Sequence, residues 1–451
     1  MKLHIPKAGW FVLLGAMAGL GAAAQEPLTL RQAIQQALGA NPEARQASAE
    51  TREARANASL ARTQLFPQLN FTEDISRGDD PVYVFGAKLR QQAFTQADFA
   101  VNALNRPLPI GNFASRFSGQ WMAFDSFRTQ KTIHSADLMR KSAASSEAAV
   151  NQKIVLNVVE AYQSVLYAER QVTVTQHELD TAQALLASVN DHVKAGLAVE
   201  SDRMSAEVNV AARKQELIAA QGGLEMAWAQ LRVAVGTPDL KETGLAPIAP
   251  HDFPAAALNA EVQAAYKTRS DLAALNQAQS AQAEAVSAAK FGFGPRIAAY
   301  GNWEQDRPTF AGAGGNNWVA GVQLNIDITP FAKRAQLEHE RAARDRVDAQ
   351  VTSYRQQVQL QVTQAHIARQ TALLSLKTAQ AALDQSAESL RILRNRYGAG
   401  LATITDLLHA EDAERESQNN YWRAVYGNAV AYAQLLFATG SLTPDAAEEL
   451  Q

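Results

Sequence analysis

The sequence predicts an α+β membrane protein that is internally duplicated, with long coiled-coil helical hairpins and four transmembrane β-strands. Three observations predict this fold class: a turn motif that occurs twice, four stretches of alternating polar and apolar residues, and helical stretches too long for a globular core. Each observation fixes a different part of the chain, and together they account for nearly all of it.

The repeated motif is Ala-Gly-Leu-Ala, which contains Gly196 in the first half of the chain and Gly400 in the second. An aspartate follows at the same distance in both copies, Asp202 and Asp406. A glycine supplies the left-handed residue that ends a helix, and an aspartate near the next helix start accepts hydrogen bonds from free backbone N–H groups. Each copy therefore predicts the tight turn of a helical hairpin, and the two copies predict a duplicated chain.

The duplication divides the chain into five predicted segments. Residues 1–24 form a secretory signal peptide, with two lysines, an apolar run and three alanines before the cleavage site. Each repeat contains a helix, two strands and a long helical hairpin. The first repeat covers 25–236, a Pro/Gly-rich connector covers 237–254, the second repeat covers 255–440, and a short tail covers 441–451.

Composition narrows the class of protein further. The formal net charge is −3, and a mildly acidic chain is a poor partner for nucleic acid. The chain has no cysteine, so packing and assembly rather than disulfides must hold an exported protein of this length together. After the signal peptide no stretch approaches the roughly 18 apolar residues of a transmembrane helix. Any membrane span must therefore be built from β-strands.

Four stretches are predicted as strands because polar and apolar residues alternate along them. They are Gln68–Ser76, Ala114–Phe124, Arg296–Glu304 and Asn317–Ile328. A half-buried strand of a soluble sandwich gives the same alternation, but lengths of about ten residues and terminal aromatic residues favour lipid-facing barrel strands. Four strands cannot close a barrel, so several copies are expected to share one. The first repeat is the longer one, and its extra residues are expected in a Gly/Pro/Asn-rich loop at 78–112.

The longest helical stretch, residues 129–193, contains no proline or glycine. Hydrophobic residues recur there every seven positions, a period that predicts a left-handed coiled coil. The corresponding series in the second repeat passes through Arg369 and ends at Tyr397. At a rise of 1.5 Å per residue, a helix of this length spans roughly 100 Å. The helices are therefore expected to form a rod.

A signal peptide followed by a doubled order of helix, two strands and long hairpin resembles the TolC-like outer-membrane efflux proteins. The matching motifs are the two Ala-Gly-Leu-Ala turns, Val159-Glu-Ala-Tyr162, and the helix ends at Gly236 and Gly440. The resemblance implies a homotrimer with a shared twelve-stranded barrel in the outer membrane and a helical tunnel in the periplasm. It also implies two partners, a periplasmic adaptor and an inner-membrane transporter of RND, ABC or MFS type, and no cofactor.

The resemblance also implies roles for residues near the hairpin turns. Asp202 and Tyr397 match residues that tie the closed tip of the tunnel, whereas the arginine of that lock is replaced here by Ala402. Asp406 matches an aspartate of the constriction, and the second aspartate of that ring is replaced by His409. The turn residues that the adaptor is expected to contact are Gly196, Leu197, Gly400 and Leu401.

A ring of three carboxylates in a narrow pore attracts cations and raises its own pKa values. A ring of three histidines is near neutral at pH 7 and becomes positive in acid, so we hypothesise that the constriction responds to pH. Simpler interpretations stay open. The two aspartates can act as N-caps alone, His409 can be a solvated helical residue, Tyr397 can be a coiled-coil core position, and the acidic run 411–414 can be a solvated face.

The sequence contains none of the motifs that mark common enzyme classes, such as His-Glu-x-x-His, Gly-x-Ser-x-Gly or a phosphate-binding loop. Its histidines are not paired at helix-face spacing for a metal. The predicted function is therefore a passive exit duct in the outer membrane for tripartite efflux or type I secretion. The alternatives are a soluble periplasmic coiled-coil adaptor or scaffold and, with no supporting residues, an exported hydrolase.

Overall fold

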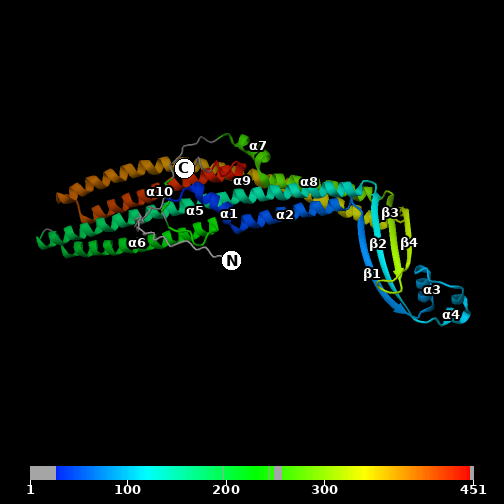
Figure 1. Cartoon of the computed structure of the whole chain (residues 1–451). Helices are drawn as coiled ribbons and strands as arrows, with labels where there is room; N and C mark the ends of the chain where they lie inside the picture. The colour runs from blue at the N-terminus through cyan, green and yellow to red at the C-terminus, as the bar shows by residue number, and fades with distance from the viewer. Residues whose placement is uncertain (1–26, 197, 243, 248–255, 447–451) are drawn as a thin grey trace, which may run out of the picture.

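The computed structural model describes residues 27–196, 198–242, 244–247 and 256–446. The predicted signal peptide, Leu197, much of the connector and the end of the C-terminal tail lie outside the described residues. The protein is a long helical rod with a narrow β-sheet at one end and a small helical insertion beyond the sheet (Figure 1). None of the described helices combines the length and the apolar character that crossing a membrane requires.

The rod is built from two similar sets of four helices. The first set is α1 (Leu30–Ala40), α2 (Pro42–Thr63), α5 (Arg128–Lys194) and α6 (Glu200–Val235), and the second is α7 (Leu258–Thr268), α8 (Ser270–Phe291), α9 (Phe331–Gly398) and α10 (Ile404–Thr439). Helices α5 and α9 contain 67 and 68 residues, so each spans roughly 100 Å at 1.5 Å per residue. Both run from the sheet to the opposite end of the rod, where they turn back into α6 and α10 (Figure 1).

The duplication is visible in one close backbone contact that occurs in each half. Gly236 ends α6 with φ +76°, and a Cβ added there would lie 2.6 Å from the Cα of Asn41. Gly440 ends α10 with φ +76°, and a Cβ there would lie 2.8 Å from the Cα of Arg269. Asn41 and Arg269 are the residues at which α1 passes into α2 and α7 into α8. The predicted internal duplication of the fold is confirmed.

The four strands form one antiparallel sheet in the order β1-β2-β3-β4. They are β1 (Gln68–Gly78), β2 (Ile110–Phe124), β3 (Arg296–Arg307) and β4 (Gly315–Asn325). All four predicted strands exist, but β2 begins earlier than expected and β4 ends three residues before Ile328. Beyond β4, Asp327 forms ion pairs with Arg296 and Lys333. These contacts fix the start of α9 instead of extending the strand.

The two faces of the sheet differ in chemistry, because cross-strand partners share a face. One face carries apolar side chains that are exposed on the single chain: Leu69, Phe71, Phe117, Trp303, Trp318, Val322 and Leu324. Phe71, Phe117, Trp303 and Trp318 form an aromatic row across the four strands. The ring centroids are 4.7 Å apart for Phe71–Phe117 and 5.8 Å apart for Phe117–Trp303. The opposite face is polar and includes Asn70, Thr72, Asp74, Ser76, Asn112, Arg116, Glu304, Asp306 and Asn317. Such a division is typical of strands between lipid and an aqueous lumen.

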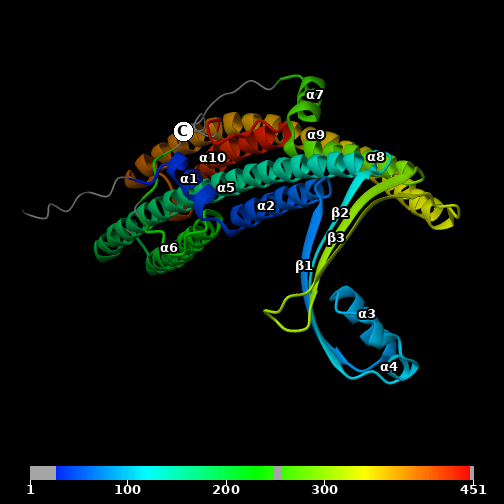
Figure 2. The same cartoon turned by 45° about the vertical axis from the view of Figure 1, so that its right-hand side comes forward.

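The segment between β1 and β2 is helical, which corrects the prediction of a loop at 78–112. It contains α3 (Pro81–Arg90), the 3-10 helix η1 (Gln96–Phe99) and α4 (Val101–Asn105). Asp80 caps α3 by accepting a hydrogen bond from the Tyr83 N–H, and Pro81 occupies the first turn, where its missing N–H costs nothing. The turn signals Asp80-Pro81 were therefore helix-start signals. Figure 2 shows this insertion at the end of the sheet remote from the rod.

The main hydrophobic core lies midway along the rod, around α5. Tyr162 is fully buried there, and its hydroxyl lies 2.7 Å from the Leu28 carbonyl and 2.8 Å from the Ala246 carbonyl. It thereby ties the start of the first repeat to the described part of the connector. Burial raises the pKa of Tyr162, so the hydroxyl remains a neutral donor. Tyr162 is a core residue of the rod with a specific polar contact at its tip.

Candidate functional site

The candidate site is the end of the rod remote from the sheet, where both helical hairpins turn (Figure 1). In the first turn Gly196 has φ +69° and its N–H donates to the Val193 carbonyl, which ends α5. Asp202 then accepts a hydrogen bond from the Val199 N–H at 3.4 Å at the start of α6. Leu197, a predicted contact for an adaptor, lies outside the described residues.

The second turn is better ordered by hydrogen bonds. Gly400 has φ +73°, and Leu401 beside it is exposed. The Thr403 N–H donates to the Asp406 carboxylate at 3.0 Å, and the Thr403 hydroxyl donates to the same oxygen at 2.7 Å. The Asp406 N–H donates back to the Thr403 hydroxyl at 3.2 Å, which completes a capping box.

These hydrogen bonds determine the charge state of Asp406. They hold the pKa of its carboxyl below the usual range, with smaller contributions from the charges of Arg396 and His409. The expected increase in pKa would arise only from neighbouring copies of the same carboxylate. On the single chain the capping bonds dominate, so Asp406 is a stable negative charge at the start of α10. The capping interpretation of Asp406 is therefore correct on the single chain.

Tyr397 joins the two hairpins. It packs against a cluster that contains Val189 of the first hairpin and Ile404 of the second, and also against a cluster around Leu390 and Leu407. Burial raises the pKa of the Tyr397 hydroxyl, and the negative charge of Asp202 raises it further. Tyr397 and Asp202 are thus close enough to interact electrostatically, although no hydrogen bond joins these two described side chains.

The remaining predicted site residues are spread around the turn. His409 is exposed one turn beyond Asp406 on α10, and Ala402 precedes the capping box. The side chain of Arg396 donates to the Leu401 carbonyl at 3.4 Å and so fastens the second turn. The sequence reasoning missed Arg396, because only the folded turn brings it back onto a residue five positions later.

A cluster of charged side chains links the hairpins farther from the turns. Arg213 on α6 forms a 2.8 Å ion pair with Asp412 on α10 and a 2.7 Å pair with Glu216. Arg415 on α10 lies 3.3 Å from Asp412 and 3.7 Å from Glu216. The acidic run at 411–414 is therefore more than a solvated face: Asp412 is half exposed, but Asp412 and Glu411 form ion pairs with other helices. Its charge pattern alone could not identify Arg213, which is far away in sequence.

Glu178 on α5 lies at the centre of this cluster, beside a cavity of about 110 Å³ lined by residues of all four long helices. Both carboxylate oxygens are buried, and neither accepts a hydrogen bond from the described residues. Burial raises the pKa of Glu178 to about 7, although the charges of Arg415 and Arg213 oppose the increase. Glu178 is therefore a buried acid that changes charge near neutral pH at a junction between the hairpins.

The arrangement suits mechanical and electrostatic roles. Within the described residues no group of three or more His, Cys, Asp or Glu side chains is placed to hold a metal ion. The turns instead present short loops that expose apolar side chains, Val199 and Leu401 among them, and the charged cluster holds two hairpins together. Such an end can bind a protein partner and can change the separation of its hairpins.

Comparison with known proteins identifies the class of protein. The outer membrane efflux protein family matches residues 33–237 and 262–441, which is most of the chain. The chain belongs to the outer membrane efflux protein family. The two matched segments coincide with the two halves of the rod, each with its pair of strands. A comparison with curated proteins gives no match.

Solved structures of outer membrane channels share the fold of this efflux protein. CusC matches with a TM-score of 0.78 and 18% identity, covering 91% of this chain and 92% of CusC. The CmeC outer membrane channel of Campylobacter jejuni matches with a TM-score of 0.77 and 15% identity, covering 99% and 97%. The open state of the MtrE outer membrane channel of Neisseria gonorrhoeae matches with a TM-score of 0.75 and 19% identity, covering 92% and 90%.

Family membership confirms the predicted function. The chain is an exit duct of the outer membrane, with a tunnel that extends into the periplasm. Channels of this family form trimers and work with periplasmic adaptors and inner-membrane transporters, and the family is one of transport ducts rather than enzymes. The alternative of a soluble adaptor or scaffold does not fit a chain that carries an exposed apolar sheet face and matches outer membrane channels.

Proposed function

We propose that this duct is a homotrimer in which three sheets close into one twelve-stranded barrel. The observation that carries the proposal is the open sheet. In the described chain β1 and β4 are the two edges, and each pairs with one neighbour only. A long unpaired edge is unstable in lipid because its N–H and C=O groups have no partner. Pairing β4 of one copy with β1 of the next satisfies both edges.

The rod provides a second argument for association. Helix α6 exposes apolar side chains along much of its length, and α9 exposes three at intervals of seven residues. The residues are Met204, Val208, Ile218, Met226 and Val233 on α6, and Leu360, Ile367 and Leu374 on α9. Because these are outer helices of different hairpins, neighbouring copies can pack one stripe against the other. Three copies arranged in this way would enclose a tunnel that continues the barrel.

We propose that the hairpin turns form the periplasmic aperture and the docking surface for an adaptor. Asp202 and Tyr397 lie where the two hairpins meet, and Asp406 with His409 lies at the start of α10. The exposed turn residues available to an adaptor are Gly196, Gly400 and Leu401, together with Leu197 by its position in the sequence. The inner-membrane transporter coupled through that adaptor is of RND, ABC or MFS type.

The repeat boundaries at 25–236 and 255–440 belong to the same proposal. The repeated contact of Asn41 with Gly236 and of Arg269 with Gly440 supports them. A connector over 237–254 would then join two equivalent units. In the trimer these units would alternate around the tunnel as six similar hairpins.

The proposal is tested by measuring the mass of the purified protein in detergent and its conductance in planar bilayers. We expect a trimer that forms ion-conducting channels. Val322→Glu places a charge on the exposed apolar face and should impair insertion, because a charged side chain that faces lipid destabilises a transmembrane strand. Asn70→Glu places the same charge at an exposed position of the polar face and should be tolerated. A monomer without channels would contradict the proposal.

A further inference from the structure

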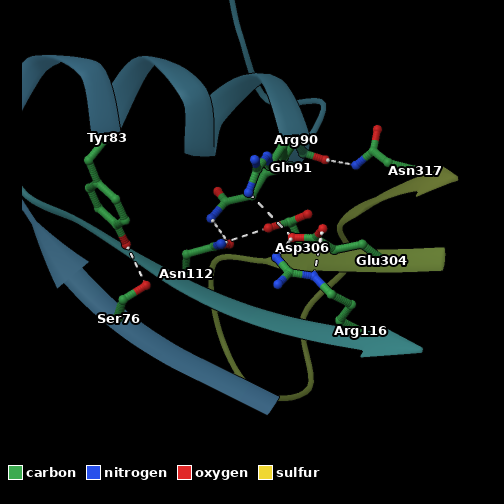
Figure 3. Close-up of polar contacts among 9 residues, drawn as sticks. All are labelled: Ser76, Tyr83, Arg90, Gln91, Asn112, Arg116, Glu304, Asp306 and Asn317. Carbon is green, nitrogen blue, oxygen red and sulfur yellow. Dashed lines mark hydrogen bonds and ion pairs between the residues drawn. The ribbon is translucent and has the colours of Figure 1, made fainter. Parts of the chain in front are cut away.

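The insertion between β1 and β2 forms its side-chain hydrogen bonds and ion pair with residues on the polar face of the sheet. At the start of α3, the Tyr83 hydroxyl donates to the Ser76 hydroxyl on β1 at 3.0 Å. At its end, the Arg90 carbonyl accepts a hydrogen bond from the Asn317 amide on β4 at 3.1 Å. Ser76 and Asn317 belong to the two edge strands, so α3 crosses the whole width of the sheet (Figure 3).

The centre of this contact is a buried polar chain. Gln91 donates to the Asn112 side-chain oxygen at 2.9 Å, and the Asn112 amide donates to Asp306 at 2.7 Å. All three residues are buried on the single chain. One carboxylate oxygen of Asp306 is buried without a hydrogen-bond partner among the described residues, but the Gln91 and Asn112 amides are both paired. Displacing Gln91 would leave further buried donors and acceptors without partners, which favours the observed arrangement. The end of α3 is therefore held firmly against β2 and β3.

Charged residues reinforce the contact. Arg90 from α3 and Arg116 from β2 both approach the Glu304 carboxylate, at 3.4 Å and 3.0 Å (Figure 3). Gly315 on β4 allows the close approach, because a Cβ added there would lie 2.1 Å from the Arg90 carbonyl oxygen. Contacts to all four strands and a glycine that makes room indicate that the sheet face is built to receive α3.

The proposed function, on which this inference rests, determines whether the polar face of the sheet is turned to lipid or to the lumen. In the proposed barrel the apolar face with its aromatic row is turned to lipid, so the polar face lines the lumen. Strand β1 leaves the rod at Gln68 and reaches the insertion after Gly78, which places α3 at the outer end. We propose that α3 lies inside the outer mouth of the barrel and forms a constriction that limits the size of exported solutes.

Three insertions, one from each copy, would narrow the lumen from three sides. The polar side chains of α3 are used in its contact with the sheet, whereas Val82 and Leu89 on the free side of the helix are exposed. The constriction would therefore act by reducing the width of the lumen and so hold back large solutes. It is distinct from the aperture at the hairpin turns, because the two lie at opposite ends of the protein (Figure 1). The duct would then have a selective position at its outer end as well as a gated one at its inner end.

The first test removes the insertion. Gly78 and Ile110 are Cα partners in the β1–β2 ladder, so an Asn-Gly turn can replace residues 79–109 without disturbing the register. We expect the single-channel conductance in planar bilayers to rise by roughly twofold or more, because a wider pore offers less resistance. An unchanged conductance in this variant would overturn the inference.

The second test keeps the chain length. Arg90→Ala combined with Gln91→Ala frees the end of α3 and should also raise the single-channel conductance. This variant tests the inference if the deletion variant does not fold. Arg106→Ala is the matched control, since it removes the same charge from an exposed position of the same insertion. A conductance that responds equally to the control, or to neither change, would overturn the inference.

Labelling gives an independent readout. The chain has no cysteine, so Gln120→Cys on the polar face, on the rod side of α3, supplies a single target. A small maleimide added from outside the cell should label it in the otherwise unchanged protein, and a large polyethylene-glycol maleimide should label it only without the insertion. Labelling by the large reagent in both proteins would contradict the inference. A protein that forms no channels would instead contradict the proposed function.

Discussion

The guanidinium of Arg213 lies 2.8 Å from the carboxylate of Asp412, and this ion pair joins α6 of the first hairpin to α10 of the second. Arg213 is largely buried, whereas half of the Asp412 side chain is exposed. A pair between different hairpins resists their separation, unlike the many pairs along this rod that join residues of one helix. The aperture is therefore expected to depend on this contact.

Arg213→Ala should shift the duct towards an open inner end. A partly exposed ion pair contributes about 1 kcal/mol, so its loss should change the ratio of closed to open states by roughly fivefold. Channel recordings in planar bilayers measure this as a higher open probability. Arg391→Ala is the control, because Arg391 pairs with Glu388 on its own helix. Equal behaviour of the two variants would refute a role for the interhelical pair.

Glu178 should make the stability of the hairpin junction depend on pH. Its pKa is raised from 4.5 to about 7 by burial, so the folded state binds a proton more tightly than the unfolded state does. The stabilising effect of that proton is fully present below about pH 4.5 and is lost as the pH rises through 7. The charges that face Glu178 are those of Arg415, Arg213, Glu216 and Glu414.

Glu178→Gln should remove this loss, because the amide stays neutral. Thermal unfolding of the purified protein at pH 5 and pH 8 measures the effect. The variant should have a higher unfolding temperature than the unchanged protein at pH 8 but not at pH 5. Glu388→Gln is the control: Arg391 lowers the pKa of Glu388, so its charged form is favoured. A Glu178→Gln variant with an unaltered difference between pH 5 and pH 8 would disprove the prediction.

Gly236→Ala and Gly440→Ala should each destabilise the protein. Both glycines have φ +76°, and an added Cβ would lie within 3 Å of backbone atoms of Asn41 or Arg269. Strain of this kind costs about 1–3 kcal/mol, before any repacking of the neighbouring backbone. Gly39→Ala in α1 meets no atom within 4 Å and should be neutral or stabilise by about 0.5–1 kcal/mol. Thermal unfolding compares the three, and equal effects would contradict the close contact.

His409 should make cation conductance depend on pH if it lines the aperture. Histidine gains positive charge as the pH falls from 8 to 5, which weakens the attraction of cations to the neighbouring Asp406. Cation conductance should therefore decrease in acid, and His409→Ala should abolish the decrease. His339→Ala changes an exposed histidine elsewhere on the rod and should leave it intact. Conductance that is insensitive to pH in both proteins would exclude the role.

The sequence predicted those parts of the fold that depend on patterns within short stretches of the chain. The alternation in β4 and the heptads of α5 appear in short windows, so the four strands and the long helices could be recognised. The insertion was missed because Asp80-Pro81 starts a helix as readily as a turn, and the choice depends on the contacts of Tyr83 and Arg90 with the sheet. The charged cluster was missed because Arg213 and Asp412 are 199 positions apart.

The sequence by itself determined the duplication, the positions of the helices and strands, and the two glycine turns, because each depends on periodicity or on the conformation of single residues. Only the tertiary structure decided which face of the sheet is polar across all four strands, that α3 lies on that face, and that Glu178 is buried among charges of the other hairpin. These features depend on strand register and helix packing, which bring together residues from opposite halves of the chain.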